Sequence, residues 1–183
     1  ALGGRSIIAD PRSPSMQKQL NLKVKFRESF RPFAPSVLAE YASDWFDVEG
    51  CSPYMLQVGK VKDCKRLNEM SKSQGLEQIN VPRSVVPAIT HVDNSARIQT
   101  VHQCSNPIFH KLISRFNEIT GCPMLVNTSF NIRGEPIVCS PLDAFKCFMG
   151  TELDLLVVGN FVLLKEEQNT NTLHRYESSY ELD

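Results

Sequence analysis

The chain has 183 residues, and its 20 Lys plus Arg balance 20 Asp plus Glu, so the formal net charge is zero. This balance argues against nucleic acid or an anionic membrane surface as the main partner, and any anion site must be local. The length suits one domain with a sizeable core, which we expect at residues 1–167, followed by a polar C-terminal tail at residues 168–183.

Neither a membrane-spanning run nor a secretion signal is visible, because no apolar stretch approaches the roughly 20 residues that cross a bilayer. The six cysteines are scattered without a C-x-x-C pair, which is typical of reduced thiols packed as small hydrophobes. We therefore expect a cytoplasmic protein with no membrane partner. The chain also begins at Ala1 without an initiator methionine, and we expect it to be a fragment of a longer polypeptide.

In the first half of the chain, Pro32 and Pro35 prevent a continuous helix from running through residues 23–36. Ser13 and Pro14 form a typical N-cap and first-turn pair. In chain order we expect a short helix at 14–22, an extended or strand-and-turn segment at 23–36, a helix at 37–46, a strand at 53–61 and a polar surface excursion at 62–83.

The second half of the chain carries clearer signals of secondary structure. Asn106 and Pro107 open an amphipathic helix that ends at Gly121, with Ile108, Leu112, Ile113 and Phe116 expected to face inward. Further elements expected are a strand at 96–101, a buried strand at 123–126, a helix that starts after the Ser140 N-cap with Asp143 in the capping-box position, and a hairpin turning at Gly159 and Asn160. Strands interleaved with helices predict an α/β domain around a mixed sheet.

The stretch "NTSFNIRGEP" (127–136) interrupts an apolar run at the expected end of a buried strand. Hydroxyl and amide groups at the carboxyl end of such a strand often line the ligand crevice of an α/β sheet. Short polar side chains also satisfy the backbone of their own turn, which explains the same pattern without a ligand. Composition alone leaves both interpretations open.

A basic segment is the second candidate feature. Arg5, Lys23, Lys25, Arg27 and Arg31 fall within 27 residues, and an extended chain would point Lys23, Lys25 and Arg27 to one side. Fixed cations of this kind bind phosphate, arginine through two oxygens at once and lysine as a point charge.

An edge strand guarded by lysine explains the basic pattern equally simply. Phe26, Phe30 and Phe33 favour a segment anchored to a core, and Arg97 is a candidate for a further cation of the same site.

His91 and Asp93 have an H-x-D spacing that occurs in metal and acid/base sites. No third or fourth ligand lies nearby in the sequence, so we interpret the pair as ordering a turn and assign no metal ligand. Trp45 is interpreted as a core residue.

Three long segments, 1–38, 87–101 ("PAITHVDNSARIQTV") and 124–148 ("MLVNTSFNIRGEPIVCSPLDAFKCF"), resemble the C-terminal region of the O-carbamoyltransferases that act on nodulation factors and antibiotics. The resemblance implies a YrdC-like fold, a twisted mixed sheet with helices and a concave basic cavity. "TSFNIRGEP" is similar to the Ser-Ala-Asn-x-Ser-Gly signature of that fold, and Lys25 and Arg27 match its Lys-x-Arg pair. Phe130 and Arg133 depart from the signature, so threonine-carbonate chemistry is not carried over.

The resemblance also implies a reaction, in which ATP and carbamoyl phosphate give carbamoyl adenylate and pyrophosphate. An upstream sugar-kinase-like domain of the same polypeptide would then pass the carbamoyl group to an acceptor hydroxyl. Magnesium is expected with ATP. The implied catalytic residues are Lys25, Arg31, Arg97 and Ser129, and the implied residues binding nucleotide or carbamoyl phosphate are Arg5, Arg27, Asn127, Thr128 and Asn131.

Two alternatives belong to other classes. A non-catalytic accessory domain would pack on the upstream domain and close its active site. A double-stranded RNA binder is disfavoured by the neutral net charge, because RNA affinity depends on excess cations.

Overall fold

The computed structural model describes residues 2–67 and 81–169, and these residues form two compact units. The first unit comprises Ala1–Gln17 and Pro32–Thr128, and the second comprises Lys18–Arg31 and Ser129–Asp183. Most of the expected surface excursion at 62–83 and nearly all of the expected tail at 168–183 lie outside the described residues.

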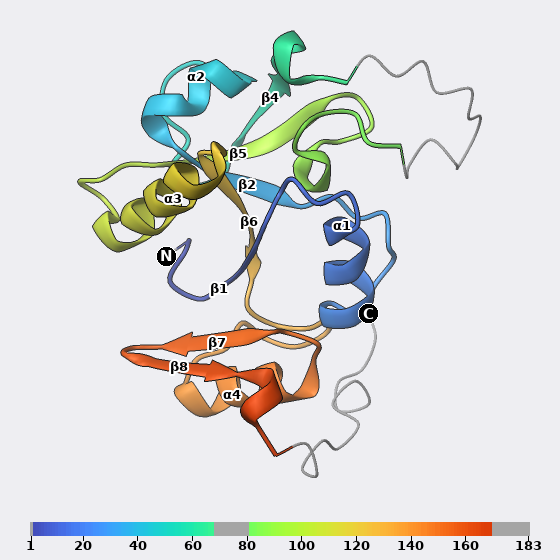
Figure 1. Ribbon diagram of the computed structural model, residues 1–183, viewed down its shortest axis with the longest axis vertical. Coiled ribbons are helices and arrows are strands. Elements are labelled where there is room, and N and C mark those ends of the chain that lie inside the picture. Colours follow the sequence, from blue (N-terminus) through green and yellow to red (C-terminus); the bar gives the residue numbers. More distant parts are fainter. Residues whose placement is uncertain (1, 68–80, 170–183) are drawn as a thin grey trace. The chain divides into compact units, whose positions relative to one another are not determined.

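A six-stranded mixed sheet forms the first unit, in the order β1-β6-β2-β5-β4-β3. Its strands are β1 (Ser6–Ala9), β2 (Ala34–Leu38), β3 (Phe46–Asp47), β4 (Gln57–Val61), β5 (Ser95–Val101) and β6 (Met124–Ser129). Strands β2 and β5 run parallel with Ser36 opposite Gln99, whereas β2 and β6 run antiparallel. Figure 1 shows β2 between β5 and β6. The expected mixed α/β architecture is therefore confirmed.

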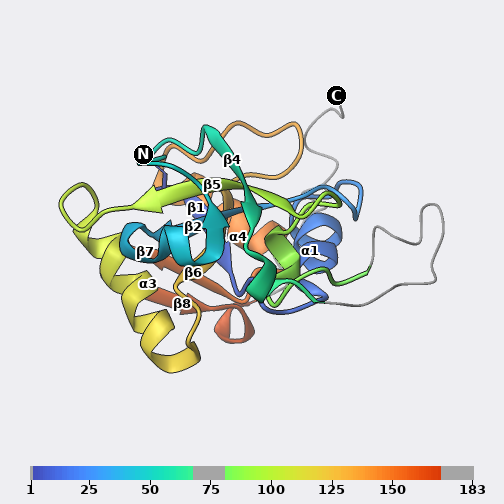
Figure 2. The ribbon, with the colours of Figure 1, turned by 90° about the horizontal axis from the view of Figure 1, so that it is seen from above.

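Helix α3 (Pro107–Thr120) packs on this sheet through Phe109 and Ile113 (Figures 1 and 2). The expected caps are present: the Asn106 side chain accepts a hydrogen bond from the Phe109 amide, and Gly121 has a φ of 71°. The expected inward face is only partly correct, since Ile113 is buried but Ile108 is 84% exposed and Leu112 is 46% exposed. At 3.6 residues per turn, the buried stripe runs through positions 109, 113 and 116 instead.

The predicted helix at 37–46 is only partly correct, because residues 39–45 are helical but both ends of the range lie in strands. Val37 and Leu38 end strand β2, a single 3-10 turn spans Ala39–Tyr41, and helix α2 covers only Ala42–Trp45 before β3 begins. All five residues of β2 are buried, so its apolar side chains show no alternation and resemble one side of a short helix.

The predicted extended conformation of 23–36 is also wrong at its start. Helix α1 (Met16–Gln19) begins two residues later than the expected 14–22 helix and continues through a π-helical turn at Leu20–Val24. Lys25 remains in the helical region of backbone space, and Phe26 has a φ of 49°. The chain is therefore curled here, and the alternation that would align Lys23, Lys25 and Arg27 does not apply.

The remaining expectations for the first unit fit the structure. Strand β5 is present, and β4 occupies the second half of the expected 53–61 strand. The Asp93 carboxylate accepts hydrogen bonds from the Ser95 amide and hydroxyl, and the His91 amide donates to the Ser95 carbonyl, so the pair does order a turn. Trp45 is buried.

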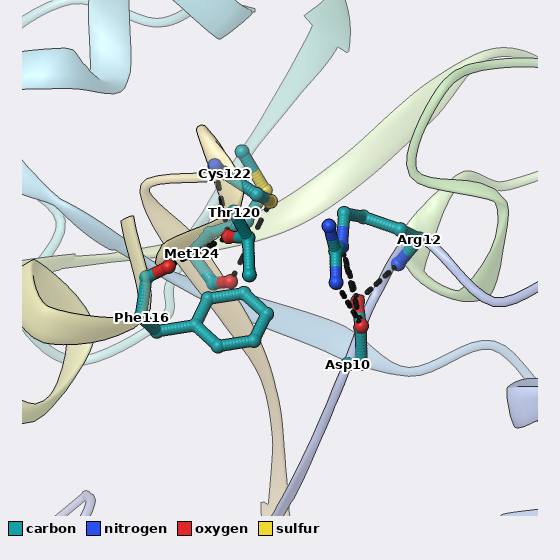
Figure 3. Close-up of polar contacts among 6 residues, drawn as sticks. All are labelled: Asp10, Arg12, Phe116, Thr120, Cys122 and Met124. Carbon is teal, nitrogen blue, oxygen red and sulfur yellow. Dashed lines mark hydrogen bonds and ion pairs between the residues drawn. The ribbon is translucent and has the colours of Figure 1, made fainter. Parts of the chain in front are cut away.

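The turn after β1 contacts α3 through the Arg12 side chain, which lies beside Phe116 (Figure 3). The Arg12 guanidinium donates to both carboxylate oxygens of Asp10, with its Nε at 2.9 Å from Oδ1 and its Nη2 at 2.6 Å from Oδ2. It lies 5.4 Å from the centre of the Phe116 ring. The neighbouring Cys122 thiol is buried, which raises its pKa to about 11.

The second unit contains helix α4 (Pro141–Gly150) and a hairpin of β7 (Leu155–Val158) and β8 (Phe161–Leu164) (Figure 1). The predicted capping box is present, with the Ser140 hydroxyl accepting from the Asp143 amide and the Asp143 carboxylate accepting from the Ser140 amide. The hairpin turns at Gly159, whose φ is 59°, as predicted.

All six cysteines are free thiols. Within residues 2–67 and 81–169, no helix combines the length and apolarity required to span a membrane.

Candidate functional site

A pocket of about 460 Å³ lies within the second unit. One wall comes from the segment that follows the π-helical turn, and the other comes from the loop that follows β6. The lining residues are Lys25, Arg27, Arg31, Ser129, Asn131, Ile132, Arg133, Gly134, Glu135 and Pro136. The basic segment and the polar loop therefore meet in one cavity, although about 100 residues separate them in the sequence.

Lys25 is the most deeply placed cation of the pocket, with only 4% of its surface exposed. Its Nζ lies 2.6 Å from the Ser129 carbonyl and 3.2 Å from the Ser129 hydroxyl. It also lies 2.9 Å from the Asn131 carbonyl and 2.8 Å from Asn131 Oδ1. Burial, assisted by the charge of Arg27, lowers the pKa of Lys25 from 10.5 to about 8. The ammonium group is therefore held in place, and its pKa lies close to neutral pH.

The loop from Ser129 to Glu135 folds back on itself around Asn131. The Ser129 hydroxyl donates to Asn131 Oδ1 at 2.6 Å, and Asn131 Nδ2 donates to the Glu135 carbonyl at 2.6 Å. The Ile132 amide donates to Glu135 Oε2 at 2.9 Å, and Gly134 takes a φ of 76°. These polar side chains thus satisfy their own turn, and the same turn aims oxygens at Lys25.

The arginine side of the pocket is organised by Asn21, which is fully buried. Its Nδ2 donates to the carbonyls of Ser29 (3.0 Å) and Arg31 (2.9 Å), and its Oδ1 accepts from Arg27 Nε at 2.7 Å. Asn21 therefore fixes the course of the segment and the orientation of the Arg27 guanidinium. Burial lowers the pKa of Arg27, which nevertheless keeps its charge at neutral pH.

Glu28 bridges the two arginines at the pocket's edge. Its carboxylate lies 3.2 Å from Arg31 Nε and 3.7 Å from Arg133 Nη1. These contacts hold two guanidinium groups that come from opposite walls. Because Lys25, Arg27, Arg31 and Arg133 line the pocket with one carboxylate, that of Glu135, the lining carries a formal excess of three positive charges. Such a pocket is suited to a polyanion such as a phosphate ester.

The pocket brings together five of the predicted site residues: Lys25, Arg27, Arg31, Ser129 and Asn131. The other four, Arg5, Arg97, Asn127 and Thr128, belong to the first unit, where their roles stay predictions. Arg97 is exposed on β5 opposite Val58 of β4. The buried Asn127 amide donates to Ser36 Oγ at 2.8 Å and to Gln99 Oε1 at 3.1 Å, which commits both of its hydrogens within the sheet.

Some features of the basic segment differ from expectation. Lys23 does not line the pocket and instead pairs with Glu152 at 2.6 Å. Phe33 is a core residue as expected, whereas Phe30 is 53% exposed. Asn21 and Glu135 were not predicted as site residues. The only sequence signal for Glu135 is an acidic residue inside an otherwise basic and polar loop.

No group of three or more His, Cys, Asp or Glu side chains that would hold a metal ion occurs in the part of the chain that the structure describes. The pocket is lined mainly by cations, amides and a hydroxyl, groups that suit an anion.

Comparison with known proteins gives one family across almost the whole chain: the family described as "Carbamoyltransferase C-terminus" matches residues 1–165. Uncharacterized protein sll1178 of Synechocystis sp. is 56% identical over 187 residues, covering 100% of this chain and 30% of the relative. Nodulation protein NolO of Bradyrhizobium diazoefficiens is 44% identical, covering 90% of this chain and 28% of that protein.

Nodulation protein U of Rhizobium tropici is 39% identical over 134 residues, covering 73% of this chain and 20% of that protein. The chain thus spans between about a fifth and a third of the length of these relatives.

Proposed function

The chain belongs to the family of carbamoyltransferase C-termini, and we propose that its part in carbamoyl transfer is to make carbamoyl adenylate from ATP and carbamoyl phosphate. In this reaction the carbamoyl group becomes bonded through oxygen to the α-phosphorus of ATP, and pyrophosphate leaves. Phosphate leaves from carbamoyl phosphate, with one water taken up. Both substrates are polyanions, which matches the excess of cations in the pocket.

The observation that carries this proposal is the pairing of Lys25 with the loop at Ser129 and Asn131 inside a pocket that also holds three arginines. A volume of about 460 Å³ lies within the usual range for sites that take cofactor-sized ligands. Reactions at phosphorus depend mainly on positioning and on charge stabilisation, so they require no covalent nucleophile from the protein.

The pocket residues have different roles, which follow from the chemistry of their side chains. Lys25 is a point charge, whereas Arg31 and Arg133 offer planar forks to pairs of phosphate oxygens as charge moves in the transition state. Arg27 binds phosphate from its fixed position beside Asn21. Ser129 and Asn131 orient the carbamoyl or phosphate group by hydrogen bonding. Magnesium would enter as the complex with ATP, and we assign it no protein ligand.

Transfer to an acceptor hydroxyl is proposed for a different, upstream sugar-kinase-like domain of the same polypeptide. The support is that matched relatives are several times longer than this chain, which covers 20% to 30% of them.

The free cysteines suit a reducing compartment, and we propose the cytoplasm as the location.

Ligand titration tests the site directly. Isothermal titration with ATP·Mg²⁺ and with carbamoyl phosphate should show at least roughly ten-fold weaker binding to Lys25→Ala than to the wild type, because the pocket loses its central cation. Lys23→Ala is the matched control, since Lys23 lies in the same segment but pairs with Glu152 outside the pocket. Equal affinities of the wild type and Lys25→Ala would contradict the proposal.

Pyrophosphate release separates catalysis from an accessory role. In a polypeptide of the relatives' full length, Lys25→Ala should nearly abolish pyrophosphate release from ATP and carbamoyl phosphate. A domain that only closes the upstream site would leave this release close to the wild-type rate.

A further inference from the structure

Glu135 is a buried carboxylate in a pocket otherwise charged by cations. Only 8% of its surface is exposed. Burying a carboxylate is costly unless hydrogen bonds and opposite charge compensate it, so the neighbours of Glu135 indicate what it does.

The hydrogen bonds of Glu135 hold the pocket loop. Its carboxylate accepts from the Ile132 amide at 2.9 Å and from the buried Cys147 thiol of α4, and its carbonyl accepts from Asn131 Nδ2 at 2.6 Å. The last bond orients the Asn131 amide so that Oδ1 faces Lys25 Nζ at 2.8 Å. The bond to Asn131 comes from the main chain of residue 135, so the carboxylate itself acts on Lys25 by closing the turn at Ile132 that presents Asn131.

The charge of Glu135 acts on Lys25 as well. The four oxygens within hydrogen-bond distance of Lys25 Nζ all belong to neutral groups. The ionisable groups that face Lys25 are Arg27 on its own segment, Glu135 on the loop and Cys147 on α4. Arg27 is positive, and burial raises the pKa of the Cys147 thiol to about 12, which keeps it neutral. Of these three groups, Glu135 is the one that carries a formal negative charge.

We propose that Glu135 is a positioning residue for Lys25. Its carboxylate holds the loop that presents Asn131, and its negative charge favours the charged form of the buried Lys25 ammonium when no anionic ligand is bound. The loop contacts and the charge balance carry this inference. Its consequence for ATP binding rests on the proposed function, whereas its consequence for the titration of Lys25 does not.

Three variants separate charge from shape. Glu135→Gln keeps an oxygen to accept from the Ile132 amide but removes the charge, and Glu135→Asp keeps the charge but shortens the reach to that amide. Glu152→Gln is the matched control, because Glu152 is an exposed carboxylate of the same unit that pairs with Lys23 away from the pocket.

The first experiment follows the ¹³Cε signals of labelled lysines by NMR over a pH series, with the Lys25 signal assigned by its absence in Lys25→Arg. Lys25 should titrate near pH 8 in the wild type and in Glu152→Gln, well below ordinary lysines. In Glu135→Gln its midpoint should fall by about one unit, because the neutral form is no longer opposed by a negative neighbour. An unchanged midpoint in Glu135→Gln would overturn the proposal.

Glu135→Asp keeps the test decisive if Glu135→Gln fails to fold. Its Lys25 midpoint should remain near pH 8 because the charge is still present. A fall as large as that expected for the neutral variant would show that shape, not charge, controls Lys25, and would overturn the electrostatic part of the proposal.

The second experiment measures the affinity for ATP·Mg²⁺ at pH 6.5 and pH 8.5. Glu135→Gln should bind about as well as the wild type at pH 6.5 and roughly eight-fold more weakly at pH 8.5, since a smaller fraction of Lys25 is then charged. An equal loss at both pH values would indicate a merely structural role. If no variant and no wild-type protein binds ATP, the proposed function fails, and the NMR titration still decides the role of Glu135.

Discussion

Lys25 illustrates what burial does to a single cation. The side chain gives up water for four protein oxygens, and the loss of solvation lowers its pKa from 10.5 to about 8. Because its folded pKa is lower than its unfolded pKa, the unfolded chain binds more protons between about pH 8 and pH 10.5. The contribution of Lys25 to the free energy of unfolding therefore rises with pH across that window.

The same shift predicts a pH-dependent affinity for anions. Wild-type affinity for ATP·Mg²⁺ should fall as the pH rises through about 8, since Lys25 loses its charge there. Lys25→Arg stays charged throughout and should show a flatter profile, even if its different shape weakens binding at every pH. Titration calorimetry at several pH values between 6.5 and 9.5 measures both slopes, and parallel slopes would argue against Lys25 as the titrating group.

The cysteines give a second test at this scale. Cys51, Cys64, Cys104 and Cys139 are exposed, whereas burial raises the pKa of Cys122 to about 11 and that of Cys147 to about 12. Reaction with a chromogenic disulfide reagent at pH 8 should therefore show a fast phase of four thiols and a slow phase of two, because the thiolate is the reactive form. Addition of denaturant should merge the two phases, and six fast thiols in the native protein would contradict the burial.

Among the elements, the helices with side-chain caps were predicted well. Asn106 and Gly121 bound α3, and the Ser140 and Asp143 capping box starts α4, because these signals act between residues a few positions apart. The misplaced start of the predicted helix at 37–46 shows the limit of this approach. Val37 and Leu38 belong to a fully buried strand, which lacks the alternation that identifies strands from sequence.

The capping box of α4 should be measurable as stability. Ser140→Ala should lower the free energy of unfolding by about 1 kcal/mol, since the Asp143 amide loses its acceptor. Ser140→Asp retains an acceptor oxygen and should stay close to the wild type. Urea denaturation followed by circular dichroism compares the three proteins, and equal midpoints would mean that the cap contributes nothing.

For the whole molecule, the neutral net charge conceals a pocket with a formal excess of three positive charges. The stability of the sheet and the charge of this pocket depend on different residues. In the first unit, Ser36, Gln99 and Asn127 form a buried hydrogen-bonded cluster that links β2, β5 and β6, and none of the three lines the pocket.

Gln99→Leu should therefore affect stability and binding differently. The substitution removes the Gln99 oxygen that accepts from the Ser36 hydroxyl and from the Asn127 amide, and the expected loss is about 2 kcal/mol in the free energy of unfolding. Affinity for ATP·Mg²⁺ at a temperature where the variant is folded should be unchanged. Gln99→Glu, which keeps an acceptor in the same place, is a useful comparison, and a loss of affinity with unchanged stability would contradict this assignment.

By itself, the sequence determined the α/β class, the capped helices, the hairpin at Gly159 and the two segments from which the pocket is built, because local spacing and backbone preferences encode these features. Only the tertiary structure decided which atoms of Ser129 and Asn131 contact Lys25, that Lys23 pairs with Glu152 instead, and that Glu135 lies near enough for its charge to act on Lys25. Those outcomes depend on burial and on contacts across about 100 residues of chain. Desolvation and charge pairing arise only when such distant segments pack together, so no local pattern records them.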